Sequence, residues 1–337
     1  MKIFTKEVKE IIAFVSFCIL SIYSFALSGC SCKTPSNNFI NVENTIEYQQ
    51  GFSVHFLDVG QGDCIFIHFP DGKNMLIDCG SESEDIVNYI NSCLNVYSVK
   101  DIDYLVLTHP ENDHVGNAIS IINEYNVKSA YITKINNLEN FAFYAQIIDK
   151  LIEEQAQINY SQIFKNIINE NCSIMFLSPM PLGFPNSSLS DLNQNSYPST
   201  EQKNNVSPIM FLEYNGVKFL FTGDAGVSQE QLVLSNYKAN LYKNYSVSLE
   251  DIDFLKVAHH GSNDSCSGEF LSLIKPKNAI ISVGGDNIFG HPSSEVLERL
   301  QNANKNYNLF RTDRDGSVSV FVDEMGKVNV ECSVKKK

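Results

Sequence analysis

Four side chains that can bind a metal ion lie within one short segment of the chain. Residues 108–114 read THPENDH, and they contain four candidate ligands: His109, Glu111, Asp113 and His114. The segment follows a short apolar run that is typical of a buried strand, and it precedes a run with helical spacing. A loop at the carboxyl end of a strand can direct alternating side chains at one point, whereas a lone histidine is more often structural. The cluster therefore predicts a metal centre.

Two later segments repeat the arrangement of an apolar strand followed by polar side chains. Residues 219–224 read FLFTGD and end on Asp224 beside a glycine. Residues 255–262 read LKVAHHGS and carry His259 and His260 after another apolar run. Two more strand ends therefore offer candidate ligands.

The order of these motifs resembles that of the metallo-β-lactamase fold hydrolases. The shared pattern is His-x-(His or acid)-x-Asp-His, then Gly-Asp, then His-Gly. Within this family the chain most resembles the extracytoplasmic domain of ComEC competence proteins, over roughly residues 51–325. The motifs that carry this resemblance are FLDVGQGD (56–63), LID (76–78), AHHGS (258–262), GHP (290–292) and RTDRDG (311–316). The resemblance implies an α/β fold, an αββα sandwich, which agrees with two strand-rich halves whose helices follow their strands.

The resemblance also implies a set of metal ligands. Six residues match the ligand positions of the family: His109, Glu111, Asp113, His114, Asp224 and His259. His109, Glu111 and Asp224 would face one metal position, the remaining ligands would face the other, and Asp224 would bridge the two. Asp78 is predicted to orient a ligand histidine, with a turn cap as the alternative. His260 is set apart from His259 because adjacent residues on an extended segment point in opposite directions.

Two departures from the family pattern bear on the number of metal ions. Glu111 stands where the family has a second histidine, and no histidine lies between His114 and His259. Asn204 or Asn205 is the candidate substitute, and Asn205 is the predicted one, although an amide is a weak ligand. We therefore expect one tightly held divalent ion and a second, looser one. Because the site is rich in carboxylates, we expect Mn²⁺ before Zn²⁺.

The resemblance predicts a reaction as well as a site. A divalent metal lowers the pKa of its bound water to about 7, supplies hydroxide at neutral pH and offsets the charge on a phosphoryl oxygen. Asp113 is predicted to accept a proton from that water, and His291 to protonate the leaving oxygen or to hold the phosphate. The alternative for His291 is a structural residue at a helix entry, since residues 292–295 have the composition of a helix start.

The amino-terminal residues predict export and a lipid anchor. Residues 11–27 are an apolar run after a charged start, and residues 27–30 read LSGC, which resembles the lipobox of bacterial lipoproteins. We therefore predict a lipoprotein signal peptide over residues 1–29 and lipidation of Cys30. An uncleaved membrane anchor is the alternative, because the apolar run is at the short limit of a span. Either anchor predicts an extracytoplasmic chain attached to the bacterial cell membrane.

Composition and periodicity divide the rest of the chain. Residues 30–50 are polar with little periodicity and predict a flexible tether. Residues 51–337 are predicted to form one metallo-β-lactamase-like hydrolase domain. Within it, residues 135–205 are predicted to be an insertion, mostly helical to about residue 171 and an exposed loop at its end. A closing hairpin is predicted from residue 309 to residue 322.

The charge of the chain limits the partners that it can bind. The sequence has 39 Asp and Glu against 25 Lys and Arg, a formal net charge of −14. A broad positively charged surface for a long duplex nucleic acid is therefore not expected. The charge leaves room for a short, flexible phosphodiester that is drawn to the metal.

Three functions stay open on these grounds. The first is a metal-dependent phosphodiesterase or nuclease of the ComEC-like branch that acts on single-stranded DNA. The second keeps the fold and the metal but takes a cell-surface polymer, as a phosphorylcholine esterase on teichoic acid would. The third is a noncatalytic surface binding protein, against which the retention of Asp113, His114, Asp224 and His259 argues.

Overall fold

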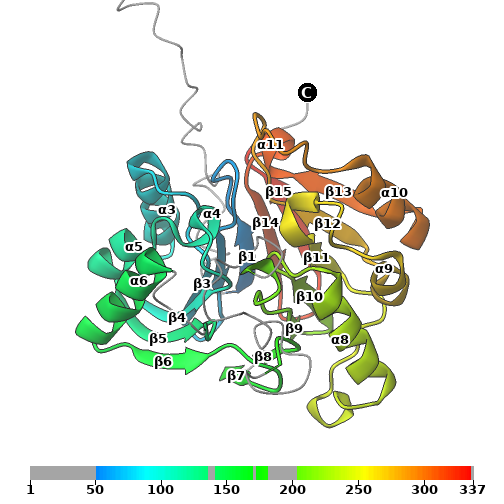
Figure 1. The fold of residues 1–337 in the computed structure, drawn as a ribbon, viewed down its shortest axis with the longest axis horizontal. Coiled ribbons are helices and arrows are strands. Elements are labelled where there is room, and N and C mark those ends of the chain that lie inside the picture. The colour runs from blue at the N-terminus through cyan, green and yellow to red at the C-terminus, as the bar shows by residue number, and fades with distance from the viewer. Residues whose placement is uncertain (1–50, 136–140, 170–171, 181–202, 335–337) are drawn as a thin grey trace, which may run out of the picture. The chain divides into compact units, whose positions relative to one another are not determined.

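Two β-sheets pack face to face, with helices on both outer faces (Figure 1). The computed structural model describes residues 51–135, 141–169, 172–180 and 203–334. Helices α3, α5 and α6 cover the outer face of one sheet, and α8, α9 and α10 cover that of the other. The prediction of an αββα sandwich is therefore confirmed.

The first sheet has eight strands among the described residues, in the order β15-β14-β1-β2-β3-β4-β5-β6. Strands β3 to β6 are parallel, and the other neighbours are antiparallel. The bounds of these strands are β1 Phe52–Phe56, β2 Ile65–His68, β3 Asn74–Ile77, β4 Asp101–Leu107, β5 Asn126–Ile132, β6 Gln157–Tyr160, β14 Val318–Val322 and β15 Val328–Cys332.

The second sheet has seven strands in the described part of the chain, in the order β13-β12-β11-β10-β9-β8-β7. Strands β10 to β13 are parallel, and the rest are antiparallel. The bounds are β7 Asn166–Asn169, β8 Cys172–Phe176, β9 Met210–Tyr214, β10 Val217–Phe221, β11 Phe254–Lys256, β12 Asn278–Ile281 and β13 Asn308–Arg311.

Two of the described helices begin at a serine cap. Ser267 and Ser293 each accept a hydrogen bond from a backbone N–H of the first turn, at α9 and α10 respectively, which is the preferred chemistry of a helix start. No helix of the described residues combines the length and the apolar character that crossing a membrane requires. The bounds are α3 Glu84–Val96, α4 Asn112–Val115, α5 Ala118–Glu124, α6 Ala142–Glu153, α8 Val227–Lys238, η3 Lys243–Tyr245, η4 Ala258–Gly261, α9 Gly268–Ile274, α10 Ser294–Ala303 and α11 Thr312–Asp315.

The main core lies between the two sheets. Side chains alternate along a strand, so Phe52, Val54 and Phe56 of β1 all point toward the second sheet. The ring of Phe52 lies 5.7 Å from that of Phe219, and the ring of Phe56 lies 6.2 Å from that of Phe221. Burial of these large rings holds the two sheets at a fixed separation and so fixes the strand ends that carry the polar loops.

Two sequence-based predictions of secondary structure are wrong. In the described part of the stretch predicted to be mostly helical to about residue 171, one helix, α6, is followed by two strands: β6, which belongs to the first sheet, and β7, which belongs to the second. The predicted closing hairpin does not form, because β13 pairs with β12 in the second sheet whereas β14 pairs with β1 and β15 in the first. Residues 312–317 therefore connect the two sheets.

The predicted signal peptide, the lipidated Cys30 and the tether fall within residues 1–50, which lie outside the described residues. Most of the predicted exposed loop, residues 181–202, lies outside them as well. The limits of the proposed insertion stay a prediction.

Candidate metal centre

The carboxyl ends of strands from both sheets meet at one edge of the sandwich. In the first sheet β1, β3 and β4 run in the same direction, and in the second β10, β11 and β12 are parallel. Loops at such ends bring together side chains that are distant in sequence. The polar residues that follow these strands are Asp63 after β1, Asp78 after β3, residues 109–114 after β4, Asp224 after β10, His259 and His260 after β11, and His291 after β12.

Four histidines surround the carboxylate of Asp224, which is buried. Its Oδ1 lies 3.2 Å from Nε2 of His114. Its Oδ2 lies 3.9 Å from Nε2 of His109 and 3.6 Å from Nε2 of His260. Nε2 of His259 is 3.8 Å from the same oxygen. Asp224 is therefore the centre of the cluster, at the position that the resemblance assigns to a bridging ligand.

Several of the converging atoms are buried and make no hydrogen bond within the described residues. They are Nε2 of His109, His114 and His260, together with Oδ1 of Asp224. Buried polar atoms are normally hydrogen-bonded, so a convergent group without partners requires an explanation. Two sets of ligand atoms lie within 4.8 Å of one another: His109, His114 and Asp224, and Asp63, His114 and His260. Imidazole nitrogens and carboxylate oxygens in this arrangement fit a divalent metal ion.

Hydrogen bonds fix the orientation of the buried histidines. Asp78 Oδ2 lies 2.7 Å from Nδ1 of His114, and the same carboxylate accepts hydrogen bonds from the backbone N–H and the hydroxyl of Thr108. Nδ1 of His260 lies 2.8 Å from the carbonyl oxygen of Ser282. Such contacts at Nδ1 leave Nε2 to face the centre. The geometry fits the orienting role predicted for Asp78, which stays a prediction.

The reason for setting His260 apart from His259 is wrong. The segment is not extended, because both residues have positive φ values, 48° and 53°, within η4. Both rings therefore face Asp224. His260 is the more deeply buried of the two, and its Nε2 also lies 3.3 Å from Oδ2 of Asp113.

The remaining predicted ligands lie at the border of the cluster. Oε2 of Glu111 is 3.8 Å from Nε2 of His109, and Oε1 accepts a hydrogen bond from Nζ of Lys203. Of the two asparagines considered, Asn204 faces His259, with Nδ2 3.2 Å from its Nε2. Asn205 instead accepts a hydrogen bond from Ser228 at 2.7 Å. The structure thus brings Asn204, and not the predicted Asn205, toward the centre.

His291 lies beside His259 at the edge of the cluster. Its ring centroid is 5.6 Å from that of His259, and its Nδ1 is buried without a hydrogen-bond partner in the described residues. Burial and the neighbouring His259 lower the pKa of His291 below its ordinary value. The ring is therefore within reach of a group bound at the centre.

Sequence reasoning missed Lys256, a buried cation beside the cluster. Its ammonium pairs with Oδ2 of Asp63 and lies 4.0 Å from Oδ1 of Asp224. Burial opposes the charged form, but the carboxylate of Asp63 followed by that of Asp224 raises the pKa of Lys256 above its ordinary value. A lysine inside an apolar strand was the available signal, since a fully buried lysine is almost always paired.

The cluster stabilises the charged forms of its own members. Burial would lower the pKa of His114, but Asp224 and Asp78 raise it well above its ordinary value. Burial would raise the pKa of Asp224, but the histidines, His114 first, hold it well below its ordinary value. The pKa of Asp113 is also lowered against the effect of burial, by the nearby imidazole of His260 and the charge of His114. A cation that binds here would displace protons from the histidines.

A glycine allows two of the polar loops to touch. Gly62 has a φ of 137°, and a Cβ at this position would lie 2.2 Å from the carbonyl oxygen of Asp113. The N–H of Asp63 donates a hydrogen bond to the same oxygen. The loop after β1 therefore packs directly on residues 109–114, and it places the Asp63 carboxylate beside His260.

Comparisons with known proteins identify relatives of this chain. ComE operon protein 3 of Bacillus subtilis (strain 168) is 28% identical over 288 residues, which cover 79% of this chain and 32% of that protein. Competence protein ComA of Neisseria gonorrhoeae is 25% identical over 261 residues, which cover 77% of this chain and 31% of that protein. Recombination protein 2 of Haemophilus influenzae is 27% identical over 257 residues, which cover 74% of this chain and 26% of that protein. The chain therefore spans about a third or less of these relatives, and the predicted resemblance to ComEC-like proteins is confirmed.

The family assignment rests on more than half of the chain. The sequence model of the Metallo-beta-lactamase superfamily matches residues 57–146 and 200–285. These two segments contain Asp63, Asp78, residues 109–114, Asp224, His259 and His260, which together form the cluster described above. The chain belongs to the metallo-beta-lactamase superfamily.

Proposed function

We propose that this chain is a metal-dependent hydrolase of phosphodiester bonds, with single-stranded nucleic acid as its substrate. Membership of the superfamily supports hydrolysis and binding of divalent metal. The observation that carries the proposal is the convergence on buried Asp224 of the Nε2 atoms of His109, His114 and His260, which make no hydrogen bond among the described residues.

A bound divalent ion would supply two effects, a lowered pKa of water and an offset of charge on a phosphoryl oxygen. His109, His114 and Asp224 would hold it, and their burial excludes competing water from the ligand atoms. Asp63 and His260 extend the ligand set on the side of Lys256. Because Lys256 already neutralises part of the charge of Asp63, we expect one tightly held ion. The carboxylates favour Mn²⁺ over Zn²⁺.

Two further residues are proposed to act on the substrate. Asp113 is half-buried at the border of the cluster, and its lowered pKa keeps it ionised at neutral pH. The ionised carboxylate can accept a proton from the attacking water, but the lowered pKa makes it a weak base. His291 faces the same space from the second sheet and would donate a hydrogen bond to a phosphoryl or leaving oxygen.

The choice of nucleic acid over a cell-surface polymer rests on the relatives, which are named for competence and recombination. The net charge of −14 disfavours a long duplex and favours a single strand gripped near the centre. We further propose that the chain works outside the cytoplasmic membrane, anchored by lipid at Cys30.

A comparison of substrates tests the proposal. The protein is loaded with Mn²⁺ or Zn²⁺ and offered bis-nitrophenyl phosphate, single-stranded DNA and a choline phosphodiester. We expect metal-dependent cleavage of the first two and little turnover of the third. Preferential cleavage of the choline ester would favour the cell-surface substrate. Firm metal binding without turnover of any of them would favour the noncatalytic alternative.

A further inference from the structure

The loop between β12 and α10 exposes two apolar side chains beside the candidate metal centre. Ile288 is 92% exposed and Phe289 is 64% exposed. Both precede His291 by at most three positions. Two neighbouring apolar side chains exposed on a loop that adjoins a site offer a contact surface for a ligand.

Aromatic rings link Phe289 to the centre. The ring of Phe289 is nearly parallel to that of His291, with 17° between the planes and 5.8 Å between the centroids. The ring of His291 lies 5.6 Å from that of His259, whose Nε2 is 3.8 Å from Asp224. A strand bound at the cluster would therefore pass the rings of His259 and His291 before it reaches Phe289.

Hydrogen bonds brace the loop that carries these side chains. The Asn287 side-chain amide donates to the carbonyl oxygens of Gly284 and His291, at 2.8 and 3.0 Å. Its Oδ1 accepts a hydrogen bond from the N–H of His291. The N–H of Gly284 donates to Oε1 of Gln61, which ties the loop to the first sheet. A loop held in this way loses little conformational entropy when a ligand binds.

We propose that Phe289, flanked by Ile288, is a stacking platform for the nucleobase next to the phosphodiester that reaches the metal centre. This inference rests on the proposed function. An aromatic face stacks any base without regard to sequence. Stacking needs no positive charge, which suits a chain whose net charge of −14 weakens attraction to phosphates. The platform selects single strands, since the bases of a duplex already stack on one another.

An aromatic ring also attracts a quaternary ammonium group, such as choline. Sites for such cations enclose the charge between several rings. Among the described residues, Phe289 is the one strongly exposed ring at this place, and its exposed neighbour is the aliphatic Ile288, whereas the ring of His291 is packed against it. A single exposed ring matches the face of a base.

Paired substrates isolate the contribution of the platform. The rates of cleavage of an oligothymidine and of an abasic oligomer of the same length are compared for the wild-type protein, Phe289→Ala and Phe289→Trp. We expect Phe289→Ala to lower the ratio of the two kcat/KM values roughly 5- to 100-fold, which is the range for one stacked base. Phe289→Trp should keep the ratio. Met325→Ala, another exposed apolar residue (91%), is the matched control and should leave it unchanged.

The outcomes separate the platform from the hydrolase. Cleavage of both oligomers with an unchanged ratio in Phe289→Ala would overturn the platform and leave the proposed function intact. If Phe289→Ala lowered kcat/KM for a choline phosphodiester as much as for oligothymidine, the platform would also be overturned, in favour of a site for an ammonium group. Fluorescence anisotropy of labelled oligomers without metal provides a readout that does not depend on turnover. Tighter binding of oligothymidine than of the abasic oligomer, lost in Phe289→Ala, would support the platform even if no cleavage occurs.

Discussion

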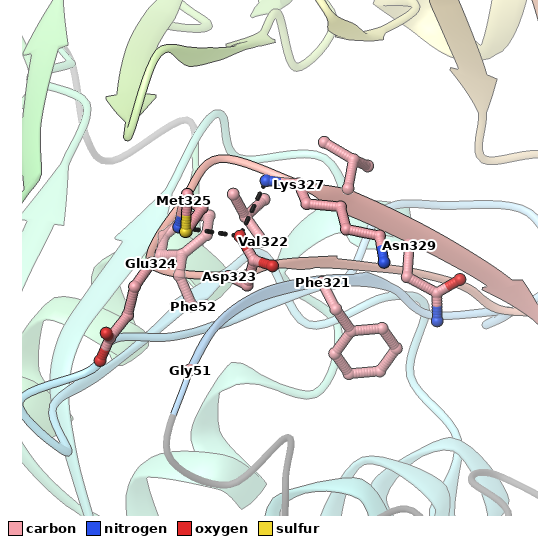
Figure 2. A pocket seen from close by; sticks show the side chains of 10 residues that line it. Gly51, Phe52, Phe321, Val322, Asp323, Glu324, Met325, Lys327 and Asn329 are labelled. Atoms are coloured by element: carbon pink, nitrogen blue, oxygen red, sulfur yellow. Dashed lines mark hydrogen bonds between the residues drawn. The ribbon is translucent and has the colours of Figure 1, made fainter.

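The two ends of the sandwich differ in what their polar groups do. At the site end, the carboxyl end of β1, buried Nε2 and Oδ1 atoms converge without hydrogen bonds. At the hairpin end, the start of β1 and the turn between β14 and β15, lies a groove of about 670 Å³ (Figure 2). The register places these ends apart, since Phe52 pairs with Val322 and Phe56 with Val318. The lining of the groove consists of Gly51, Phe52, Phe321, Val322, Asp323, Glu324, Met325, Lys327, Val328 and Asn329.

The carboxylate at the hairpin end is satisfied by its own turn. Oδ1 of Asp323 accepts hydrogen bonds from the N–H groups of Met325 and Lys327, at 2.9 and 2.8 Å (Figure 2). The buried carboxylate of Asp224 has histidines on several sides instead. The groove at the hairpin end therefore does not mark a chemical site, whereas the convergence of buried ligand atoms without hydrogen bonds does.

The largest effect is expected from Asp224→Asn, because this residue contacts every histidine of the cluster. The substitution keeps the shape and removes the charge. We expect affinity for Mn²⁺ to fall by more than the 10- to 100-fold expected when only an orienting residue is lost. Isothermal titration calorimetry measures this, with Glu324→Gln at the hairpin end as the control. Equal affinity in both variants would remove the distinction between the two ends.

Asp78→Asn is expected to act through the orientation of His114. The amide cannot hold Nδ1 and the Thr108 donors in the same way, so affinity for Mn²⁺ should fall roughly 10- to 100-fold. Asp323→Asn is the matched change, since that carboxylate also accepts hydrogen bonds, from two backbone N–H groups. It should leave metal affinity unchanged. A loss of the same size in both variants would point to general destabilisation.

A pair of glycine substitutions compares the two ends through the backbone. Gly62→Ala meets the Asp113 carbonyl oxygen, whereas Gly72, in the turn between β2 and β3, has open space around a Cβ. Both glycines have positive φ values, so each alanine substitution should lower the free energy of unfolding by about 1–2 kcal/mol through backbone strain. Gly62→Ala should lose more, and it alone should weaken metal binding. Urea unfolding and metal titration check this, and equal losses would show that the contact of the two loops is unimportant.

The smallest effect concerns His55, a buried histidine away from the cluster whose ring nitrogens are all hydrogen-bonded. Burial, with a smaller effect of His68, lowers the pKa of His55 to about 3 from 6.5. Between these values the unfolded chain binds a proton that the folded chain does not, so stability falls as the pH drops below about 6.5. The slope from this group is at most about 1.4 kcal/mol per pH unit.

His55→Asn should flatten that part of the pH dependence. Urea unfolding of the wild-type protein and the variant at pH 7 and pH 5 gives the difference. An identical loss of stability on acidification in both proteins would contradict the assignment.

The parts of the fold that follow local patterns were predictable. The turn at Asn215 and Gly216 between β9 and β10 forms as expected, with φ values of 47° and 81°. The cluster in residues 108–114 was evident because its ligands are close in sequence. The prediction of a β13–β14 hairpin was wrong because the turn residues Asp315 and Gly316 do not show which sheet each strand joins.

The rest of the site depends on contacts between distant residues. The positive φ values of His259 and His260 are uncommon outside glycine, and bonds to Asp264 and Ser282 hold those rings in place. The role of Lys256 depends on Asp63, which is far away in the sequence. No local pattern carries that information.

The proposed hydrolysis of phosphodiesters depends on a metal ion bound by the cluster around Asp224. The most direct test measures cleavage of single-stranded DNA by the Mn²⁺-loaded protein and by its His114→Ala and Asp113→Ala variants, with folding checked by circular dichroism. We predict metal-dependent cleavage by the wild-type protein, which a chelator abolishes, and none by either folded variant. Full activity in both variants would show that neither His114 nor Asp113 is needed for cleavage, and the proposed metal centre would then be wrong.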